Sequence, residues 1–312
     1  MAAGESAASR RGALKVGLVL GAGGVTGDAF HRGFLRALTD VGWDPRTARV
    51  VVGTSAGAMV GAHLRRPHQA APAARTDATV HGERLGRAPD LSALLAMLRR
   101  PWQARLGVIA TSLLPTGRHS TEFIAAGVRR FHGSEWPRQL TYICAVRRRD
   151  GRRVVFGAPG APHTDLARAV AASCAIPGFF HPVHINGEVY VDGGVHSPTN
   201  ADVVRKLDLD VVLVSSPMSV AGRLRPTLDL GPRLHAARYL RRELASLRKA
   251  GVTTFTHQPE GALLQVMGVN PLHGARVDEI EQASYAAAMA GLAGRPALVE
   301  RLTGGDGSMM TA

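Results

Sequence analysis

Cysteines and long apolar runs are scarce in this sequence. Only two of its 312 residues are cysteine, Cys144 and Cys174, and both lie in apolar segments. Two isolated cysteines provide neither a disulfide framework nor the paired spacing of a zinc site. We therefore expect buried free thiols in a reducing compartment. Nowhere do 18 apolar residues follow one another, so the sequence predicts no membrane-spanning helix.

Lysine and aromatic residues are also rare. Lysine occurs only at Lys15, Lys206 and Lys249, so the formal net charge of +14 comes almost entirely from arginines, which are spread over several segments. Aromatic residues make up 5% of the chain, and no nucleic-acid-binding motif is found. We therefore expect no nucleic-acid partner. A net positive surface leaves two interpretations open, a solvated surface and peripheral contact with an anionic membrane.

The apolar content of 45% is enough for one large core, and we find no internal repeat and no convincing second domain. We expect a disordered N-terminal segment at 1–12, one domain at 13–302 with a variable cap or lid insertion near 64–139, and a flexible tail at 303–312. Arg10 and its neighbours resemble a twin-arginine export signal. We reject that interpretation because cleavage would remove a glycine loop discussed below, and we expect a cytoplasmic location.

Residues 50–61 read V-V-V-G-T-S-A-G-A-M-V-G and predict a strand, a sharp turn and a helix. The turn has the G-x-S-x-G form of a nucleophile elbow, in which Gly53 and Gly57 allow close backbone approach. Ser55 is therefore the candidate nucleophile. The alternative is a glycine-rich turn whose serine only caps the helix.

A first strand at 16–20 leads into the glycine-rich segment 21–27, G-A-G-G-V-T-G, and then into a helical pattern. This segment approaches a dinucleotide-binding fingerprint, but its last gap is one residue too long and the second strand has no acidic residue to hold a ribose. We favour an oxyanion hole, in which the N–H groups of Gly23 and Gly24 face the negative charge that develops in acyl transfer.

A third motif, D-G-G at 192–194, follows a short apolar run. Alone it is typical of a hairpin turn. The order of the motifs is more informative. In the α/β-hydrolase fold the elbow follows several strands, whereas here Ser55 follows only the second strand and a glycine loop precedes it. This order disfavours the α/β-hydrolase fold.

Taken together, G-A-G-G at 21–24, G-T-S-A-G at 53–57 and D-G-G at 192–194 resemble the motifs of the patatin-like phospholipases. The run A-S-C-A-I-P-G-F-F at 172–180 is similar to the family's A-S-x-A-I-P-G-x-F segment, and I-N-G at 185–187 to the hairpin before its aspartate. The resemblance covers roughly residues 16–204.

The resemblance implies a single α/β domain with a central, mostly parallel sheet between layers of helices. It also implies a serine lipid acyl hydrolase, either a phospholipase A or another carboxylic ester hydrolase, that forms an acyl-enzyme from lipid or acyl esters without metal or cofactor. The site residues that it implies are the nucleophile Ser55, its dyad partner Asp192, the oxyanion donors Gly23 and Gly24, and the motif glycines Gly53, Gly57 and Gly193.

An aspartate with an ordinary pKa near 3.9 is a weak base at neutral pH, so Asp192 would need an apolar surround that raises its pKa. Apolar neighbours such as Val191 fit that requirement. A triad that uses His181, His184 or His196 in place of the dyad is left open.

The sequence departs from the family pattern at Thr26, where the family often carries arginine or lysine. Arg32 or a nearby cation could substitute, or the oxyanion role could rest on backbone donors alone. Two alternative functions therefore stay open: an acyltransferase that uses the same dyad, and a catalytically weak lipid-binding member of the fold. The sequence does not predict the oligomeric state.

The other segments predict mainly helices and a closing strand. An amphipathic helix at 90–100, followed by Trp102, has the character of a lid over a lipid interface or of an ordinary packed helix. A basic helix is expected at 234–250, with Leu240, Leu244 and Leu247 inside. The remaining expectations are helices at 120–131, 167–174 and 200–207, strands at 140–146, 154–156 and 211–215, loops at 65–89 and 217–232, a strand from 255 to about 258 that leads into a turn at 266–267, and a helical ending at 277–302.

Overall fold

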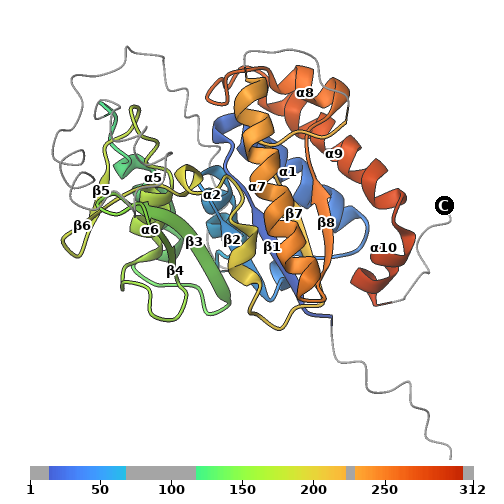
Figure 1. Ribbon diagram of the computed structural model, residues 1–312, viewed down its shortest axis with the longest axis horizontal. Helices are drawn as coiled ribbons and strands as arrows, with labels where there is room; N and C mark the ends of the chain where they lie inside the picture. The colour runs from blue at the N-terminus through green and yellow to red at the C-terminus, as the bar shows by residue number, and fades with distance from the viewer. Residues whose placement is uncertain (1–13, 68–116, 223–228, 305–312) are drawn as a thin grey trace, which may run out of the picture.

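The computed structural model describes residues 14–67, 117–222 and 229–304. One sheet runs through this part of the chain, with helices on both of its faces (Figure 1). Its strand order is β5-β6-β3-β2-β1-β7-β8, and β4 pairs with β3. The strands are β1 (Val16–Leu20), β2 (Val50–Gly53), β3 (Leu140–Arg147), β4 (Arg153–Phe156), β5 (Val183–Ile185), β6 (Glu188–Asp192), β7 (Val211–Ser215) and β8 (Thr253–His257).

The central strands β3, β2, β1, β7 and β8 are parallel. Leu20 at the end of β1 pairs with Gly53 at the end of β2 and with Ser215 at the end of β7. The chain therefore leaves these three strands at the same edge of the sheet. Ligand sites of open parallel sheets lie at this edge.

Strand β6 runs in the opposite direction and ends close to the same edge of the sheet. It is antiparallel to β3, and its last residue, Asp192, pairs with Ala145. On the same edge of β3, two residues earlier, Ile143 pairs with Gly53, while β4 pairs with the opposite edge. Two residues further along, the register places Ser55 at the level of Ala145 and therefore of Asp192. Sheet topology alone thus brings together two residues that are 137 positions apart in sequence (192 − 55).

Both faces of the parallel strands are buried, which explains their continuous apolar runs. Along β1, Val16, Leu18 and Leu20 pack toward helices α1, α9 and α10. Val19 points to the other face, toward α7. The helices are α1 (Gly24–Asp40), α2 (Ala56–Leu64), α5 (Glu122–His132), α6 (Leu166–Ser173), α7 (Leu230–Lys249), α8 (Gly261–Met267), α9 (Val277–Ala293) and α10 (Pro296–Thr303), with the short 3-10 helices η2 (Pro45–Thr47), η4 (Gly193–Val195) and η5 (Ala201–Val204).

The predicted fold class, a mostly parallel sheet between helical layers, is confirmed. Both cysteines are free and buried, as expected. The basic helix begins earlier than predicted, at Leu230, because Pro232 is tolerated in a first helical turn. The helix predicted at 200–207 is only the 3-10 turn η5. The lid helix predicted at 90–100 lies outside the described residues.

Two predictions for the C-terminal third need correction. The turn expected around 266–267 is wrong, because α8 occupies this region and packs Leu263 and Met267 against α1 and α9. The helical ending expected at 277–302 is two helices, since Pro296 starts a second one. Within the described residues, none of the helices combines the length and apolar character that a membrane crossing needs.

Candidate active site

Ser55 lies at the turn between β2 and α2 and is 4% exposed. Its φ of 53° is one of the few positive values among the described residues other than glycine, and such a backbone is strained for a residue with a side chain. A Cβ on Gly57 would lie 2.0 Å from the Leu20 carbonyl oxygen, and one on Gly53 would lie 2.5 Å from the Ala58 Cα. Only glycine fits at either position, which explains the elbow motif.

The backbone of Ser55 is hydrogen-bonded to the C-terminal end of α6. Its N–H donates to the Ser173 Oγ at 2.9 Å, and that hydroxyl donates to the Cys144 carbonyl at 2.6 Å. The Cys174 thiol donates to the Ser55 carbonyl at 3.3 Å. Hydrogen bonds from the A-S-C-A-I-P-G segment therefore fix the position of the elbow backbone. Sequence reasoning identified this segment as a family feature but missed the role of Ser173.

Asp192 ends β6 and is 5% exposed. Its backbone N–H donates to the Ala175 carbonyl, and its carboxylate accepts the Gly194 N–H at 2.7 Å. Burial raises the pKa of Asp192 to about 6, although hydrogen bonds from the Ser55 side chain and the Gly194 N–H act in the opposite direction. A carboxylate with this pKa is ionised at neutral pH and more basic than an exposed one.

The glycine loop between β1 and α1 is bonded to both of the other motifs. The Gly57 N–H donates to the Gly21 carbonyl at 3.2 Å, and the Ala22 N–H donates to the Pro198 carbonyl, six residues after Asp192, at 2.7 Å. A Cβ on Gly194 would lie 3.5 Å from the Ala22 Cβ. The structure therefore brings the three predicted motifs together at one end of the sheet.

Gly23 and Gly24 form the N-terminus of α1. A Cβ on Gly23 would lie 2.7 Å from the Pro217 ring, and one on Gly24, whose φ is 58°, would lie 2.6 Å from the Pro271 carbonyl oxygen. Within the described part of the chain, neither N–H bonds a backbone acceptor. Helix α2 begins at Ala56 beside Ser55. The positive ends of two helix dipoles therefore lie at the candidate nucleophile.

Thr26 stands where the family often has a cationic side chain, and Arg32 does not replace that cation. The Thr26 N–H donates to the Pro271 carbonyl at 3.1 Å, and its hydroxyl bonds the Gly23 carbonyl. Arg32 lies two helical turns into α1, where it pairs with Asp28 and, at 2.8 Å, with Glu281. These carboxylates hold its guanidinium at the α1–α9 interface. The expectation that Arg32 could substitute is therefore wrong.

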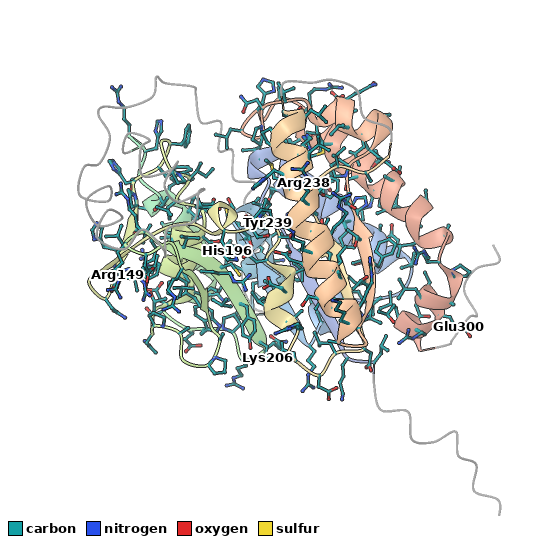
Figure 2. All side chains as sticks on the ribbon, viewed as in Figure 1. Arg149, His196, Lys206, Arg238, Tyr239 and Glu300 are labelled. Carbon is teal, nitrogen blue, oxygen red and sulfur yellow. The ribbon has the colours of Figure 1, made fainter. Side chains whose placement is uncertain are left out.

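The three histidines considered for a triad occupy other surroundings. His181 and His184 are exposed near the β5 edge of the sheet. His196, labelled in Figure 2, contributes to lowering the pKa of the nearby Asp202. In the described structure the pKa of Asp192 has its causes in burial, Ser55 and Gly194, and no histidine is among them.

A fourth histidine, His31, supports the glycine loop and was missed by sequence reasoning. It is fully buried in α1, where its Nε2–H donates to the Gly21 carbonyl at 2.7 Å and its Nδ1 accepts the Ser215 hydroxyl at 2.8 Å. Burial lowers the pKa of His31 to about 4, so it is neutral at neutral pH. A histidine on the apolar face of the predicted helix, beside Phe30 and Phe34, was the available signal.

Among the described residues, no group of three His, Cys, Asp or Glu side chains could hold a metal ion.

Comparison with known proteins gives one family and distant structural neighbours. The sequence profile of the patatin-like phospholipases matches residues 18–205. VipD from Legionella pneumophila is 12% identical, with 90% of this chain and 67% of VipD covered and a TM-score of 0.40. The type III effector ExoU is 16% identical, with 90% of this chain covered and a TM-score of 0.38.

This chain spans about half of the ExoU structure, 53% of its length. No curated protein matches it in sequence. The family profile covers more than half of the 312 residues and contains the elbow, the aspartate and the glycine loop. The chain belongs to the patatin-like phospholipase family.

Proposed function

We propose that this protein is a serine lipid acyl hydrolase in which Ser55 and Asp192 form a dyad. Family membership supports the hydrolysis of lipid esters. The dyad rests on one observation above all. Asp192 is buried, has a pKa raised to about 6, and has the Ser55 side chain among the groups that act on that pKa. This combination is what a general base for a serine nucleophile needs.

In the proposed reaction the Ser55 Oγ attacks the ester carbonyl carbon and its proton passes to Asp192. The tetrahedral oxyanion accepts hydrogen bonds from the N–H groups of Gly23, Gly24 and Ala56 at the two helix N-termini. Collapse releases the alcohol, which takes the proton from Asp192. Water then attacks the acyl-enzyme while Asp192 accepts its proton, and the acyl–Oγ bond breaks as Asp192 returns that proton to the Ser55 Oγ, which releases the fatty acid.

We also propose that α7 contacts anionic lipid. Its outer face carries Arg238, which is labelled in Figure 2, and the likewise exposed Arg241 and Arg242; these three form no ion pair within the described residues. Its acidic residue Glu243 is buried on the inner face. Sedimentation with phosphatidylglycerol vesicles tests this contact. The variant Arg238→Gln/Arg241→Gln/Arg242→Gln should sediment less, while hydrolysis of a soluble ester stays unchanged. Equal sedimentation would contradict it.

The hydrolase proposal is tested with p-nitrophenyl esters of short and long acyl chains and a fluorophosphonate probe. Wild type should turn over the esters and be labelled at Ser55, whereas Ser55→Ala should do neither. Asp192→Asn should lose turnover. If Asp192→Asn kept full activity while a histidine variant lost it, the dyad would be wrong. Transfer of the acyl group to an added alcohol in preference to water would favour an acyltransferase.

A further inference from the structure

Glu243 is a buried carboxylate on the inner face of α7, which lies across one face of the sheet (Figure 1). It is 6% exposed and lies beside Leu240 and Leu244, which pack against the sheet. Burial raises the pKa of Glu243. A carboxylate in such a place is costly unless several donors bond it. Its presence therefore needs a reason other than packing.

Among the described residues, its three hydrogen-bond donors all come from the short segment that follows Asp192. The hydroxyls of Ser197 and Thr199 each donate to Glu243 at 2.6 Å, and the Ala201 N–H donates at 2.9 Å. The charged groups nearest to this cluster are Asp202 and Arg153, which form an ion pair with each other. Glu243 therefore fastens this segment to α7.

Ser197 makes the link specific for a carboxylate. Its Oγ already accepts the N–H groups of Thr199 and Asn200, at 3.3 and 3.2 Å. Both lone pairs of the hydroxyl are thereby used, so its hydrogen must go to an acceptor. The other Glu243 oxygen accepts the Ala201 N–H, which can only donate, so an amide NH2 in place of either oxygen would face a donor.

The same segment touches the candidate dyad at two points. Gly194, three residues before Ser197, donates its N–H to the Asp192 carboxylate. Asn200 donates from Nδ2 to the Thr54 Oγ1 at 3.1 Å, and Thr54 directly precedes Ser55. The segment is thus bonded to Glu243 on one side and, on the other, to Asp192 and to the residue directly before Ser55.

We propose that Glu243 is a positioning residue of the active site, which holds residues 193–201 so that Gly194 aligns the Asp192 carboxylate and Asn200 aligns the elbow. The proposal rests on the proposed hydrolase function. Glu243 does not touch Ser55 or the substrate. Its effect passes through two hydrogen-bonded residues, and it acts on the rate of the chemical step more than on substrate binding.

The test compares Glu243→Gln, Ser197→Ala and their double variant with Glu300→Gln, a control at an exposed glutamate on α10 (Figure 2). The kcat and KM are measured with a short-chain p-nitrophenyl ester, and kcat is expressed per folded molecule from circular dichroism melts. Glu243→Gln and Ser197→Ala should each lower kcat by about 10- to 100-fold with KM within about twofold. The kcat of the double variant should fall no further than that of the more impaired single variant, because both changes break the same Ser197–Glu243 hydrogen bond. Glu300→Gln should retain wild-type kcat.

Retention of kcat per folded molecule in both single variants would overturn the proposal, even if their melting temperatures fell. Losses that multiply in the double variant would also overturn it, since the two residues would then act separately. If Glu243→Gln does not fold, Ser197→Ala decides alone. A wild type that neither hydrolyses esters nor reacts with fluorophosphonate would refute the hydrolase function together with this inference, whereas an active wild type with unaffected variants would refute only the inference.

Discussion

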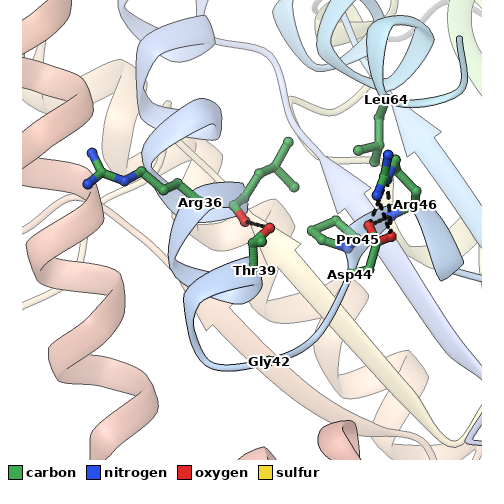
Figure 3. Close-up of a pocket in the computed structure, with 8 residues that line it drawn as sticks. Arg36, Thr39, Gly42, Asp44, Pro45, Arg46 and Leu64 are labelled. Atoms are coloured by element: carbon green, nitrogen blue, oxygen red, sulfur yellow. Dashed lines mark hydrogen bonds and ion pairs between the residues drawn. The ribbon is translucent and has the colours of Figure 1, made fainter. Parts of the chain in front are cut away.

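The two ends of the parallel strands differ in how their polar groups are arranged. At the carboxyl end, Ser55 and Asp192 are buried; the Ser55 N–H donates to the distant Ser173, and Asp192 is bonded to Ala175 and Gly194. At the amino end, an open hollow of about 520 Å³ lies beside the last turns of α1 and the 3-10 turn η2 (Figure 3). Of the charged residues that line it, Arg46 is exposed and pairs with the half-buried Asp44, and Arg36 pairs with Asp40.

The comparison teaches that volume alone does not locate the chemistry. Exposed ion pairs such as Arg46–Asp44 contribute little free energy and perturb no base toward neutral pH. At the carboxyl end, burial of Asp192 moves its pKa by about two units and a serine is held at a positive φ. Strain and buried charge persist only where the surrounding structure enforces them, and they cluster at functional sites.

The largest effect is expected for Asp192→Asn. Loss of the base should lower kcat on the order of 10³- to 10⁴-fold. The same change should stabilise the fold, because a carboxyl group whose pKa rises from 3.8 to about 6 favours folding below pH 3.8 and loses that contribution as pH rises through 6. Removing the charge should therefore raise the free energy of unfolding at pH 8 by up to about 3 kcal/mol. Thermal melts at pH 8 measure this. A lower melting temperature would contradict the pKa assignment.

The next largest effect is expected for Gly57→Ala. Its Cβ would collide with the Leu20 carbonyl at 2.0 Å, so the free energy of unfolding should fall on the order of 3 kcal/mol. Gly127→Ala in α5 is the matched control, because a Cβ there meets no atom within 4 Å. Alanine at that helical position should stabilise by up to about 1 kcal/mol. Urea unfolding of both variants checks the pair, and equal effects would show that the elbow is not closely packed.

The pH dependence of hydrolysis should follow Asp192. With a pKa of about 6, the ionised base disappears below that pH, and kcat/KM should fall about tenfold per pH unit. His31, whose pKa is lowered to about 4, stays neutral over most of this range and does not titrate with the activity. A profile of kcat/KM from pH 4.5 to 8 on a soluble ester measures this decline at acidic pH. An activity that stays flat to pH 4.5 would exclude Asp192 as the base.

The smallest effect is expected at the hollow. Arg46→Ala removes an exposed ion pair with Asp44, so the free energy of unfolding should change by less than about 0.5 kcal/mol and kcat should not change. Thermal melts and ester turnover check both quantities. A large loss of turnover would place function at the amino end and reverse the comparison.

The residues of the candidate site were predictable from local motifs, and those that hold them in place were not. The strands at 16–20 and 50–53 are marked by apolar runs. The elbow and the D-G-G turn are marked by glycine, because the backbone approaches closely there. The meeting of Ser55 with Asp192 depends on strand order and register, which a single sequence does not encode locally.

Supporting residues leave only a weak signal in the sequence. Glu243 and His31 are polar residues on otherwise apolar helix faces, a pattern visible in the sequence but ambiguous without knowledge of what faces them. Ser173 and Asn200 bond partners 118 and 146 positions away. The turn expected at 266–267 failed for a related reason, since α8 is stabilised by packing on α1 and α9.

The family profile ends at residue 205, but the architecture does not. Strand β7 lies directly beside β1, the Pro217 ring and the Pro271 carbonyl abut the glycine loop, and Glu243 anchors the segment after Asp192. A fragment cut at residue 205 would leave the edge of β1 unpaired and prone to association. The protein is therefore not modular at that boundary. Exchange of its C-terminal third would remove contacts that hold the glycine loop and the segment after Asp192.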